Sequence, residues 1–437
     1  MNRKNVGFGM RGSMLILYQA IAFYLFTVFN SFAQNIQASG NEMFYGWNAA
    51  RVSQIYTVVC LIDVLFQLLF ARKIANARNI KMISVVFMSL SIIFGFGIAT
   101  VFVSEALWLL LFALSIFFSH VGSTLLVGVL IGQWFPRRKG TVMGIATLAF
   151  PITGGALLSV FAGSYFSRGP LAAYFPFLLV GIAGIVIALI FIKDYPEQCG
   201  AYRDNDKNMD PETAKALMEQ EIEAKKNSVW TVRNIFKCRD FWFMSIPMGI
   251  LLATSVGAMT QIIGILNTYP DFYAKYGTIA TFMVTVVACA GSYIIGLLDT
   301  RFGTKKAVVI SCVFAVLTGA IGVFASVPTL LIGFYLLCIF EGAASNFAVS
   351  ISAQYWRRED FPSVYGVINP IVNVIQAFGP MAITMLGLRF GFHITLGIIG
   401  IFGVIALILI CLVNPKHIRE LDSKYRLEAG LPADSQQ

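Results

Sequence analysis

The sequence predicts an all-α polytopic membrane protein with twelve transmembrane helices in two six-helix bundles. Three observations support this fold class: the composition, the number and length of the apolar runs, and a repeat between the two halves of the chain. Of the 437 residues, 57% are hydrophobic and 12% are charged, whereas about a quarter of the residues in a soluble domain are charged.

Twelve apolar runs are long enough to cross a bilayer, whose hydrocarbon core of about 30 Å needs roughly 20 helical residues. Each run is expected to be a helix, because backbone groups in lipid must be satisfied within their own segment. The runs are 13–33, 52–71, 82–103, 106–134, 141–163, 171–192, 241–267, 277–298, 307–326, 328–355, 364–387 and 392–413. They are numbered below as spans 1 to 12.

The positive charges indicate the orientation in the membrane. With the N-terminus inside, 28 of the 32 Lys and Arg residues lie in inside segments, and only Arg51, Arg168, Lys275 and Arg389 lie outside. Cytoplasmic loops carry such an excess, so we expect a multi-pass protein of the cell membrane, plasma or inner, with both termini cytoplasmic. The net charge of +10 follows from this topology, and no nucleic-acid partner is expected.

The cysteines and histidines predict neither a disulfide nor a metal site. All seven cysteines lie in spans or inside segments, where a disulfide does not persist, and no metal-like spacing of Cys and His is present. We therefore expect them to be packing residues, and we expect no cofactor. The cysteines are Cys60, Cys199, Cys238, Cys289, Cys312, Cys338 and Cys411.

The chain divides into an N-terminal six-helix bundle at 1–192, a charged cytoplasmic linker at 193–240, and a C-terminal bundle with a cytoplasmic tail at 241–437. Within the linker, Asp210 and Pro211 predict the start of a helix, because Asp caps helices and Pro suits the first turn. Apolar residues follow at helical spacing, so we expect a short amphipathic helix, interpreted as a solvated linker rather than a regulatory domain.

The two halves of the chain are related by a repeat. The sequence QWFPRRKGTVMG at 133–144 ends span 4, and QYWRREDFPSVYG at 354–366 ends span 10. Their arginine pairs, at 137–138 and 357–358, are 220 positions apart. Parallel six-span repeats are typical of one transporter architecture, with a substrate site at the midplane between the halves.

The sequence GLLDTRFGTKK after span 8 resembles the loop motif of the major facilitator superfamily, with one extra residue between its Asp and second Gly. This resemblance implies the major facilitator fold, alternating access, and a cavity lined by spans 1, 4, 7 and 10. It also implies that the motif contributes to gating. The residues that carry it are Gly296, Asp299, Arg301, Gly303, Lys305 and Lys306.

Three short stretches resemble the monocarboxylate and oxalate/formate porter branch of that superfamily: WFPRRKGTVMGIA at 134–146, YGWNAARVS at 45–53, and YPEQCGAYRDND at 195–206. Members of the branch use an Arg in span 8 or a Lys in span 11, and neither span contains a cation here. A small dianion is therefore improbable, because nothing would offset its charge. A monoanion with a large apolar body, a neutral substrate and a cation remain open.

Three ionisable residues lie near span centres: Asp63 in span 2, His120 in span 4 and Glu341 in span 10. Such a residue costs roughly 2.5–3.5 kcal/mol on insertion scales, so it is paired, faces water, or is neutral. The functional interpretation is that Glu341 and His120 load protons and couple them to substrate movement.

Each of these residues also has a structural interpretation. Glu341 could make a fixed hydrogen bond to a Ser, Asn or Tyr of a neighbouring helix, and His120 could bond a nearby serine or a backbone carbonyl. Asp63 could pair with His120 within the first half or relay protons. FPITGG at 150–155 partly matches an antiporter motif, but a proline kink with small residues for close packing explains it too.

Several polar residues are candidates to contact substrate, in spans that the resemblance places at the cavity and in spans 8 and 11, where members of the branch carry their substrate-binding cation. They come from spans 1, 7, 8, 10 and 11. The candidates are Tyr18, Gln19, Tyr24, Gln261, Tyr293, Tyr335, Ser345, Asn346, Asn369 and Asn373.

Together these features predict a secondary active transporter of a small organic acid, a monocarboxylate or bulky organic anion, coupled to protons. The alternatives are an antiporter or exporter of a neutral or cationic organic compound, and a transporter-like receptor without net flux. No ATP-binding motif is present, and too few catalytic groups converge for an enzyme. The expected partners are a small-molecule substrate, protons and the lipid bilayer, and the expected state is a monomer.

Overall fold

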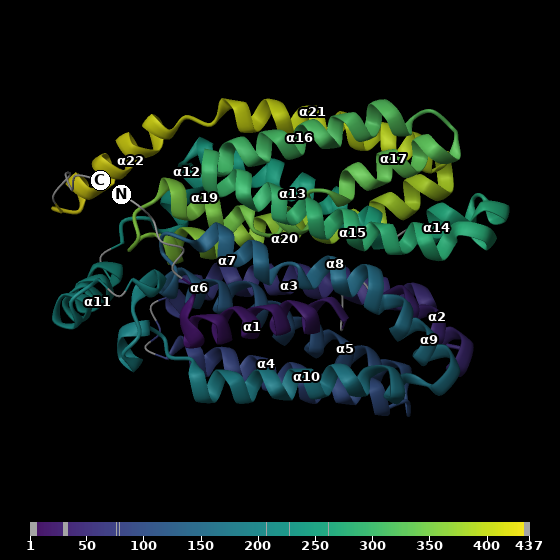
Figure 1. Ribbon diagram of the computed structural model, residues 1–437, viewed down its shortest axis with the longest axis horizontal. Coiled ribbons are helices and arrows are strands. Elements are labelled where there is room, and N and C mark those ends of the chain that lie inside the picture. Colours follow the sequence, from purple (N-terminus) through teal and green to yellow (C-terminus); the bar gives the residue numbers. More distant parts are fainter. Residues whose placement is uncertain are drawn as a thin grey trace.

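The computed structural model describes residues 7–28, 34–75, 77, 79–206, 208–226, 228–260 and 262–431, and every regular element among them is a helix. The helices form two bundles that lie side by side, one from each half of the chain (Figure 1). Both chain ends lie at the same end of the molecule, together with α11 and α22. We call this end the terminal face.

Twelve helical segments of the N-terminal bundle lie wholly within the described residues, and two of them are π-helical. They are α1 (Gly9–Phe26), α2 (Gln34–Tyr45), α3 (Ala49–Ala75), α4 (Ile80–Thr100), α5 (Glu105–His120), η2 (Val121–Leu126), α6 (Val127–Trp134), α7 (Lys139–Ala146), α8 (Ala149–Pro151), η3 (Ile152–Leu157), α9 (Leu158–Arg168) and α10 (Pro170–Phe191).

The linker and the C-terminal bundle follow. The linker contains two short 3₁₀ turns, η4 (Pro196–Cys199) and η5 (Arg203–Asn205), and the helices α11 (Pro211–Lys226) and α12 (Val232–Lys237). The bundle and tail contain α13 (Arg239–Thr260), α14 (Ile262–Asn267), α15 (Pro270–Phe302), α16 (Thr304–Gly322), α17 (Val327–Cys338), α18 (Glu341–Ala344), α19 (Phe347–Tyr355), α20 (Phe361–Phe390), α21 (Phe392–Leu412) and α22 (Pro415–Glu428).

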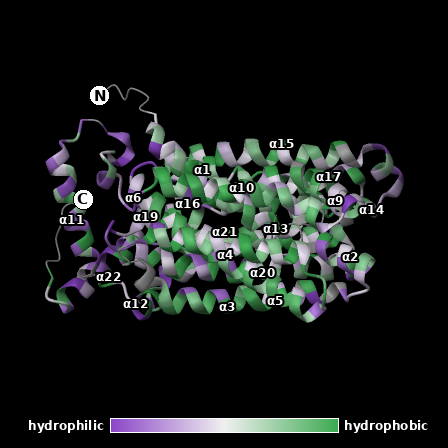
Figure 2. Ribbon diagram, turned by 90° about the horizontal axis from the view of Figure 1, so that it is seen from below, coloured by the Kyte–Doolittle hydropathy of each residue, from purple (hydrophilic) through white to green (hydrophobic). Residues whose placement is uncertain are grey.

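Nine helical stretches within the described part of the chain are long and apolar enough to cross a membrane. The other three expected spans coincide with α1, which precedes the undescribed residues 29–33, with the shorter apolar helix Gln54–Phe70, and with the segmented helices α7 to α9. Large apolar side chains lie exposed on the outer helices, where lipid would cover them. Hydrophilic residues gather at the terminal face, around α11, α12 and α22 (Figure 2).

Spans 4, 5 and 10 are not continuous α-helices. Span 4 changes to π-helix directly after His120, span 5 does so after Pro151, and span 10 breaks at Phe340, whose φ of −107° and ψ of 4° are not helical. Such irregularities often mark functional sites, and lipid tolerates irregular backbone only where protein or a cavity surrounds it. All three breaks are therefore expected to face the centre of the molecule.

The two bundles meet through two pairs of spans: α3 packs against α20, and α15 packs against α7 and η3. Within the C-terminal bundle, α13 and α20 approach closely at Gly257 and Gly379. A Cβ atom on Gly379 would lie 2.2 Å from the carbonyl oxygen of Ala253. Only glycine therefore permits this approach of two backbones.

We expect Gly379→Ala to lower the apparent melting temperature of the detergent-purified protein. The added methyl group meets backbone atoms that cannot rotate away, and overpacking of this kind costs about 1–3 kcal/mol. Gly163→Ala in α9 is the matched control, because a Cβ atom there meets nothing within 4 Å. Equal melting temperatures for the two variants would contradict the close approach of α13 and α20.

Candidate functional site

A small cavity of about 30 Å³ lies between the two bundles. It is lined by five residues of the N-terminal half, by two residues of α13, and by Ser345 and four residues of α20. The lining residues are Phe23, Phe26, His120, Met143, Phe150, Leu252, Val256, Ser345, Tyr365, Asn369, Asn373 and Gln376. This volume holds a water molecule or two, so an organic substrate can enter only when the bundles move apart.

One face of α20 supplies most of the polar lining. Tyr365, Asn369, Asn373 and Gln376 are spaced by four, four and three residues, which places them on one side of a helix. All four are more than nine-tenths buried. The amide nitrogens of Asn369 and Asn373 have no hydrogen-bond partner, and such donors are costly when buried. This face therefore presents two amide donors that a bound acceptor would satisfy.

The opposite side of the cavity is aromatic. The ring of Phe26 stacks on the imidazole of His120, with ring centres 4.9 Å apart, and Phe150 packs against both Phe26 and Phe23. The cavity thus combines an aromatic wall from the N-terminal bundle with an amide face from the C-terminal bundle.

His120 is paired with Asp63 inside the N-terminal bundle. The imidazole Nδ1 bonds the Asp63 carboxylate, and the Gln67 side-chain amide donates to the same oxygen at 2.8 Å. Asp63 is fully buried and His120 is 3% exposed. Asp63 therefore lies behind His120 rather than on the cavity surface, and it orients the ring that lines the cavity.

Glu341 is fully buried in the C-terminal bundle, and neither of its carboxylate oxygens has a hydrogen-bond partner. It does not line the cavity but lies one helical turn from Ser345, whose hydroxyl is 3.5 Å from the Glu341 carbonyl oxygen. The nearby titratable groups are the thiols of Cys289 and Cys338. No cation in the described part of the chain pairs with this carboxyl group.

The other polar residues singled out in the sequence lie in different places. Tyr18 bonds Ser84 at 2.8 Å, the Gln19 amide donates to the Ser123 carbonyl oxygen at 2.9 Å, and Tyr335 donates to the Ala280 carbonyl oxygen at 3.1 Å. Each of these three bonds joins two helices of the same bundle, the first two in the N-terminal bundle and the third in the C-terminal bundle.

Tyr24 stacks on Phe177 of α10 and does not line the cavity, and Tyr293 is 57% exposed on the outside of α15. The Asn346 amide donates to the Thr147 hydroxyl at 2.7 Å and so connects the two bundles. Gln261 lies outside the described residues. Of the residues singled out in the sequence, His120, Ser345, Asn369 and Asn373 line the cavity.

Sequence reasoning did not select the aromatic wall or Tyr365 as part of the site. Phe23, Phe26 and Phe150 resemble any other phenylalanine of a membrane helix, so no signal distinguished them. Tyr365, in contrast, continues the helical face of Asn369 and Asn373, and that periodicity could have identified it.

The loop motif after span 8 lies at the contact between the bundles. Asp299 accepts a hydrogen bond from the Thr304 hydroxyl at 2.7 Å, and the hydroxyl groups of Thr300 and Thr141 meet across the bundles at 3.2 Å. Gly303 has a φ of +88°, which favours glycine. The contact helps to close the terminal face.

The remaining motif residues support the same loop. Lys305 donates to the carbonyl oxygens of Cys411 and Val413 at the end of α21, and Lys306 lies 5.8 Å from the centre of the Phe302 ring. Gly296 faces Gly144 of the other bundle, and Arg301 is exposed.

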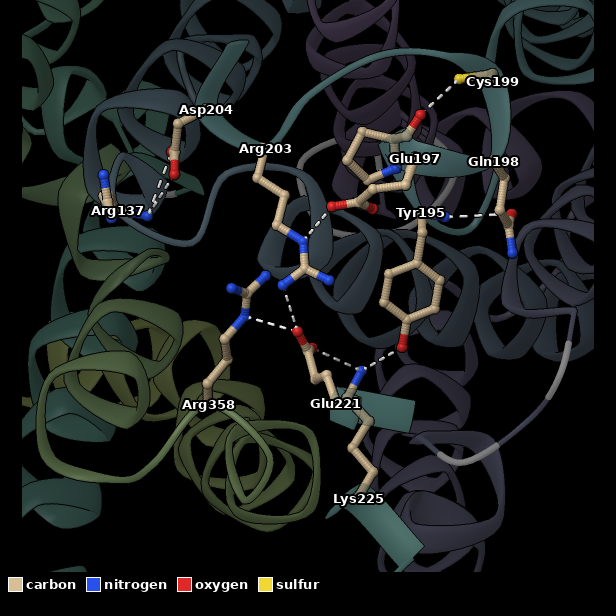
Figure 3. Close-up of polar contacts among 11 residues, drawn as sticks. Arg137, Tyr195, Glu197, Gln198, Cys199, Arg203, Asp204, Glu221, Lys225 and Arg358 are labelled. Carbon is tan, nitrogen blue, oxygen red and sulfur yellow. Dashed lines mark hydrogen bonds and ion pairs between the residues drawn. The ribbon is translucent and has the colours of Figure 1, made fainter. Parts of the chain in front are cut away.

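Glu221 of the linker helix α11 connects the linker to the C-terminal half at the terminal face. Its carboxylate contacts Arg203 at 2.7 Å, Lys225 at 3.2 Å and Arg358 at 2.9 Å (Figure 3). Burial raises the pKa of Glu221, but the three cations outweigh burial and hold it below its ordinary value. Because Arg358 follows α19, whereas Arg203 and Lys225 belong to the linker, this network fastens the linker to the C-terminal half at the closed terminal face.

Lys139 is enclosed at the same face. Its side chain is 5% exposed and its ammonium nitrogen lies 3.5 Å from the centre of the Phe361 ring, which belongs to the other bundle. Burial, followed by the nearby Arg358 guanidinium, lowers the pKa of Lys139 from 10.5 to about 7. Closing the terminal face therefore favours loss of the Lys139 proton.

The comparisons with known proteins agree with this architecture. A family model described as Major Facilitator Superfamily matches residues 14–285 and 274–432, and the chain belongs to this superfamily. The prediction of the major facilitator fold is thus confirmed. The protein is a multi-pass membrane transporter rather than an enzyme. No curated protein sequence matches the chain.

Two of the solved structures that share this fold are each 12% identical in sequence to this chain. The human organic anion transporter MFSD10 (TETRAN) matches with a TM-score of 0.65, covering 91% of this chain and 98% of its own. The proton:xylose symporter XylE, bound to 6-bromo-6-deoxy-D-glucose, matches with a TM-score of 0.68, covering 94% of this chain and 98% of its own. At this identity the similarity shows the fold alone.

We expect the Asp63–His120 pair to stabilise the N-terminal bundle. Asp63→Ala should cost about 3–5 kcal/mol, because removing one member of a buried pair leaves the other without its partner. The double variant Asp63→Ala/His120→Phe should lose less than the sum of the single variants, by about 0.5–3 kcal/mol. Additive losses in thermal or denaturant unfolding would contradict the pairing.

A second expectation concerns pH and Lys139. The folded state binds this proton less tightly than the unfolded chain, so the contribution of Lys139 to stability rises with pH between about 7 and 10.5. Lys139→Met should raise the melting temperature near neutral pH and flatten its rise towards about pH 9. Lys215→Met, on an exposed position of α11, is the control, and an identical pH profile for both variants would refute the idea.

Proposed function

We propose that this protein is a secondary active transporter of a small organic monoanion, coupled to protons, that works by alternating access. The observation that carries the substrate class is the pair of buried amide donors, Asn369 and Asn373, which lack acceptors inside a closed cavity between the bundles. A carboxylate supplies acceptor oxygens to two such donors, and His120 lies in the same cavity.

The rest of the lining supports a single charge and an apolar body. The residues that line the cavity include no Arg or Lys, so a second negative charge would be buried without compensation. The rings of Phe23, Phe26 and Phe150 offer an apolar surface to the remainder of the substrate. The resemblance of three sequence stretches to the monocarboxylate and oxalate/formate porter branch supports the same class.

Proton coupling is assigned to Glu341. An ionised carboxylate is costly in a site without hydrogen bonds or a counter-charge, so the closed state favours the form that carries a proton. Opening of the bundles would admit water to the neighbourhood of Ser345 and stabilise the ionised form. Proton release and substrate release would then accompany the same movement.

The distribution of charged residues supports an orientation of the protein in the membrane. Hydrophilic residues gather at the terminal face (Figure 2), and the segments expected inside carry 28 of the 32 Lys and Arg residues. The positive-inside rule assigns such segments to the cytoplasm. We therefore propose a protein of the cell membrane whose Glu221 network and loop motif close the cytoplasmic entrance.

The first test is a thermal-stability screen followed by transport in proteoliposomes. A ligand that binds the folded protein raises its melting temperature by mass action, and we expect bulky monoanions to do so more strongly at acidic pH. Stabilisation by neutral compounds alone would favour the second candidate, a transporter of neutral substrates, which the absence of Arg and Lys from the lining also allows. Binding without net uptake would instead indicate a receptor.

Asn373→Ala tests the amide site. The variant should bind the identified monoanion about tenfold more weakly or worse, because a hydrogen bond to a charged group contributes about 1.5–3 kcal/mol. Asn208→Ala, an exposed linker substitution, is the control. Unchanged affinity in Asn373→Ala would remove the assignment of the substrate carboxylate to α20.

Glu341→Gln tests the coupling. The neutral amide imitates the protonated acid, so we expect the variant to fold and to bind substrate but to lose the dependence of uptake on a pH gradient. Glu212→Gln in the exposed first turn of α11 is the control. Gradient-driven uptake like that of the unmodified protein would disprove the role of Glu341.

A further inference from the structure

A cluster of three potential metal ligands lies at the terminal face, where the start of α13 meets the start of α22. Cys238 and Asp240 stand at the beginning of α13, and His417, 177 positions after Asp240, lies in the first turn of α22. The Cys238 sulfur, a carboxylate oxygen of Asp240 and an imidazole nitrogen of His417 all lie within 4.8 Å of one another. Cys238 and Asp240 are fully buried, and His417 is partly exposed.

The three groups are held in place from different directions. The Asp240 carboxylate accepts a hydrogen bond from the Asn414 backbone N–H at 2.6 Å, and its other oxygen bonds the His417 Nδ1 at 2.5 Å. The Phe241 backbone N–H donates to the Cys238 carbonyl oxygen at 3.1 Å. The cluster is therefore fixed by backbone on both helices rather than by flexible side chains.

A thiolate, an imidazole and a carboxylate form a ligand set of the kind that binds zinc in proteins. Metal–ligand bonds of about 2.0–2.3 Å place the donor atoms of a tetrahedral site about 3–4 Å apart. The Asp240–His417 pair would have to open by about 1 Å and the sulfur approach by a similar amount. A water molecule could take the fourth position on the partly exposed side of His417.

We propose that Cys238, Asp240 and His417 bind a zinc-class transition metal that fastens the C-terminal helix α22 to the start of α13. Magnesium and calcium do not fit, because they prefer oxygen ligands. The guanidinium of Arg239 lies 3.8 Å from the Asp240 oxygen that bonds His417. The Arg239 side chain is 61% exposed, so it can turn into solvent when the metal binds.

The site connects two parts of the C-terminal bundle. Helix α13 carries the cavity residues Leu252 and Val256. Helix α22 also holds the segment between α19 and α20, through the contacts of Asp422 with Arg357 and of Arg426 with Asp360. The metal would therefore restrain the terminal face without touching the cavity, and the proposal stands whatever the substrate is.

The test is a cobalt titration of the full-length protein in detergent, purified without a histidine tag. We expect one Co²⁺ ion per chain, a near-ultraviolet charge-transfer band from the thiolate, and loss of that band when Zn²⁺ displaces the cobalt. The His417→Gln variant, which keeps a donor for Asp240, should bind cobalt about tenfold more weakly or worse.

Cys238→Ser should abolish the charge-transfer band, whereas Cys411→Ser, which replaces an exposed cysteine, should leave it unchanged. Size-exclusion chromatography reports whether each variant is folded, and if Cys238→Ser is not, His417→Gln decides. Three results would overturn the proposal: no charge-transfer band in the unmodified protein, a band that survives in folded Cys238→Ser, or unchanged cobalt affinity in His417→Gln.

Discussion

The burial of polar side chains between the two bundles, away from water, is the constraint on which the rest of this structure depends. A polar group in such a place needs a partner or costs free energy. The first half meets the constraint at one oxygen of Asp63, which receives bonds from His120 and Gln67, while the other oxygen has no partner. The second half does not meet it at Glu341 or at the amide nitrogens of Asn369 and Asn373. The two halves therefore differ in the polar groups that they leave unpaired and available to a substrate or a proton.

The helix breaks and the contacts at the terminal face affect how the two bundles can move. The breaks in spans 4, 5 and 10 bring irregular backbone to the centre, beside the residues that line the cavity. The terminal face meanwhile is closed by contacts that join both bundles to the linker, such as those of Glu221 with Arg358 and of Asp204 with the Arg137 backbone N–H. Because Glu221 is buried, separating its ion pair with Arg358 is inexpensive only when water reaches both charges as the terminal face opens. The closed cavity and the contacts that close the terminal face reversibly are therefore parts of one mechanism.

Much of the fold could be predicted from the sequence. The lengths of the apolar runs, the repeat and the arginine pairs were sufficient for the fold class, which the family match and the structural neighbours support. The site was predicted only in part. Asn369 and Asn373 line the cavity, yet Tyr293 of a span expected nearby lies exposed on the outside of α15. A residue's depth in a span is readable from sequence, but the rotation of that span about its axis is not.

The sequence by itself determined the class of protein and its spans, because hydrophobic length and charge distribution are local properties of a chain in a bilayer. Only the tertiary structure decided which polar side chains face one another. The Asp63–His120 pair was one of several alternatives in the sequence, and the meeting of Cys238 and Asp240 with His417 could not be seen in any spacing. These contacts join helices whose relative rotation and register are set by packing of the whole bundle, to which every helix contributes.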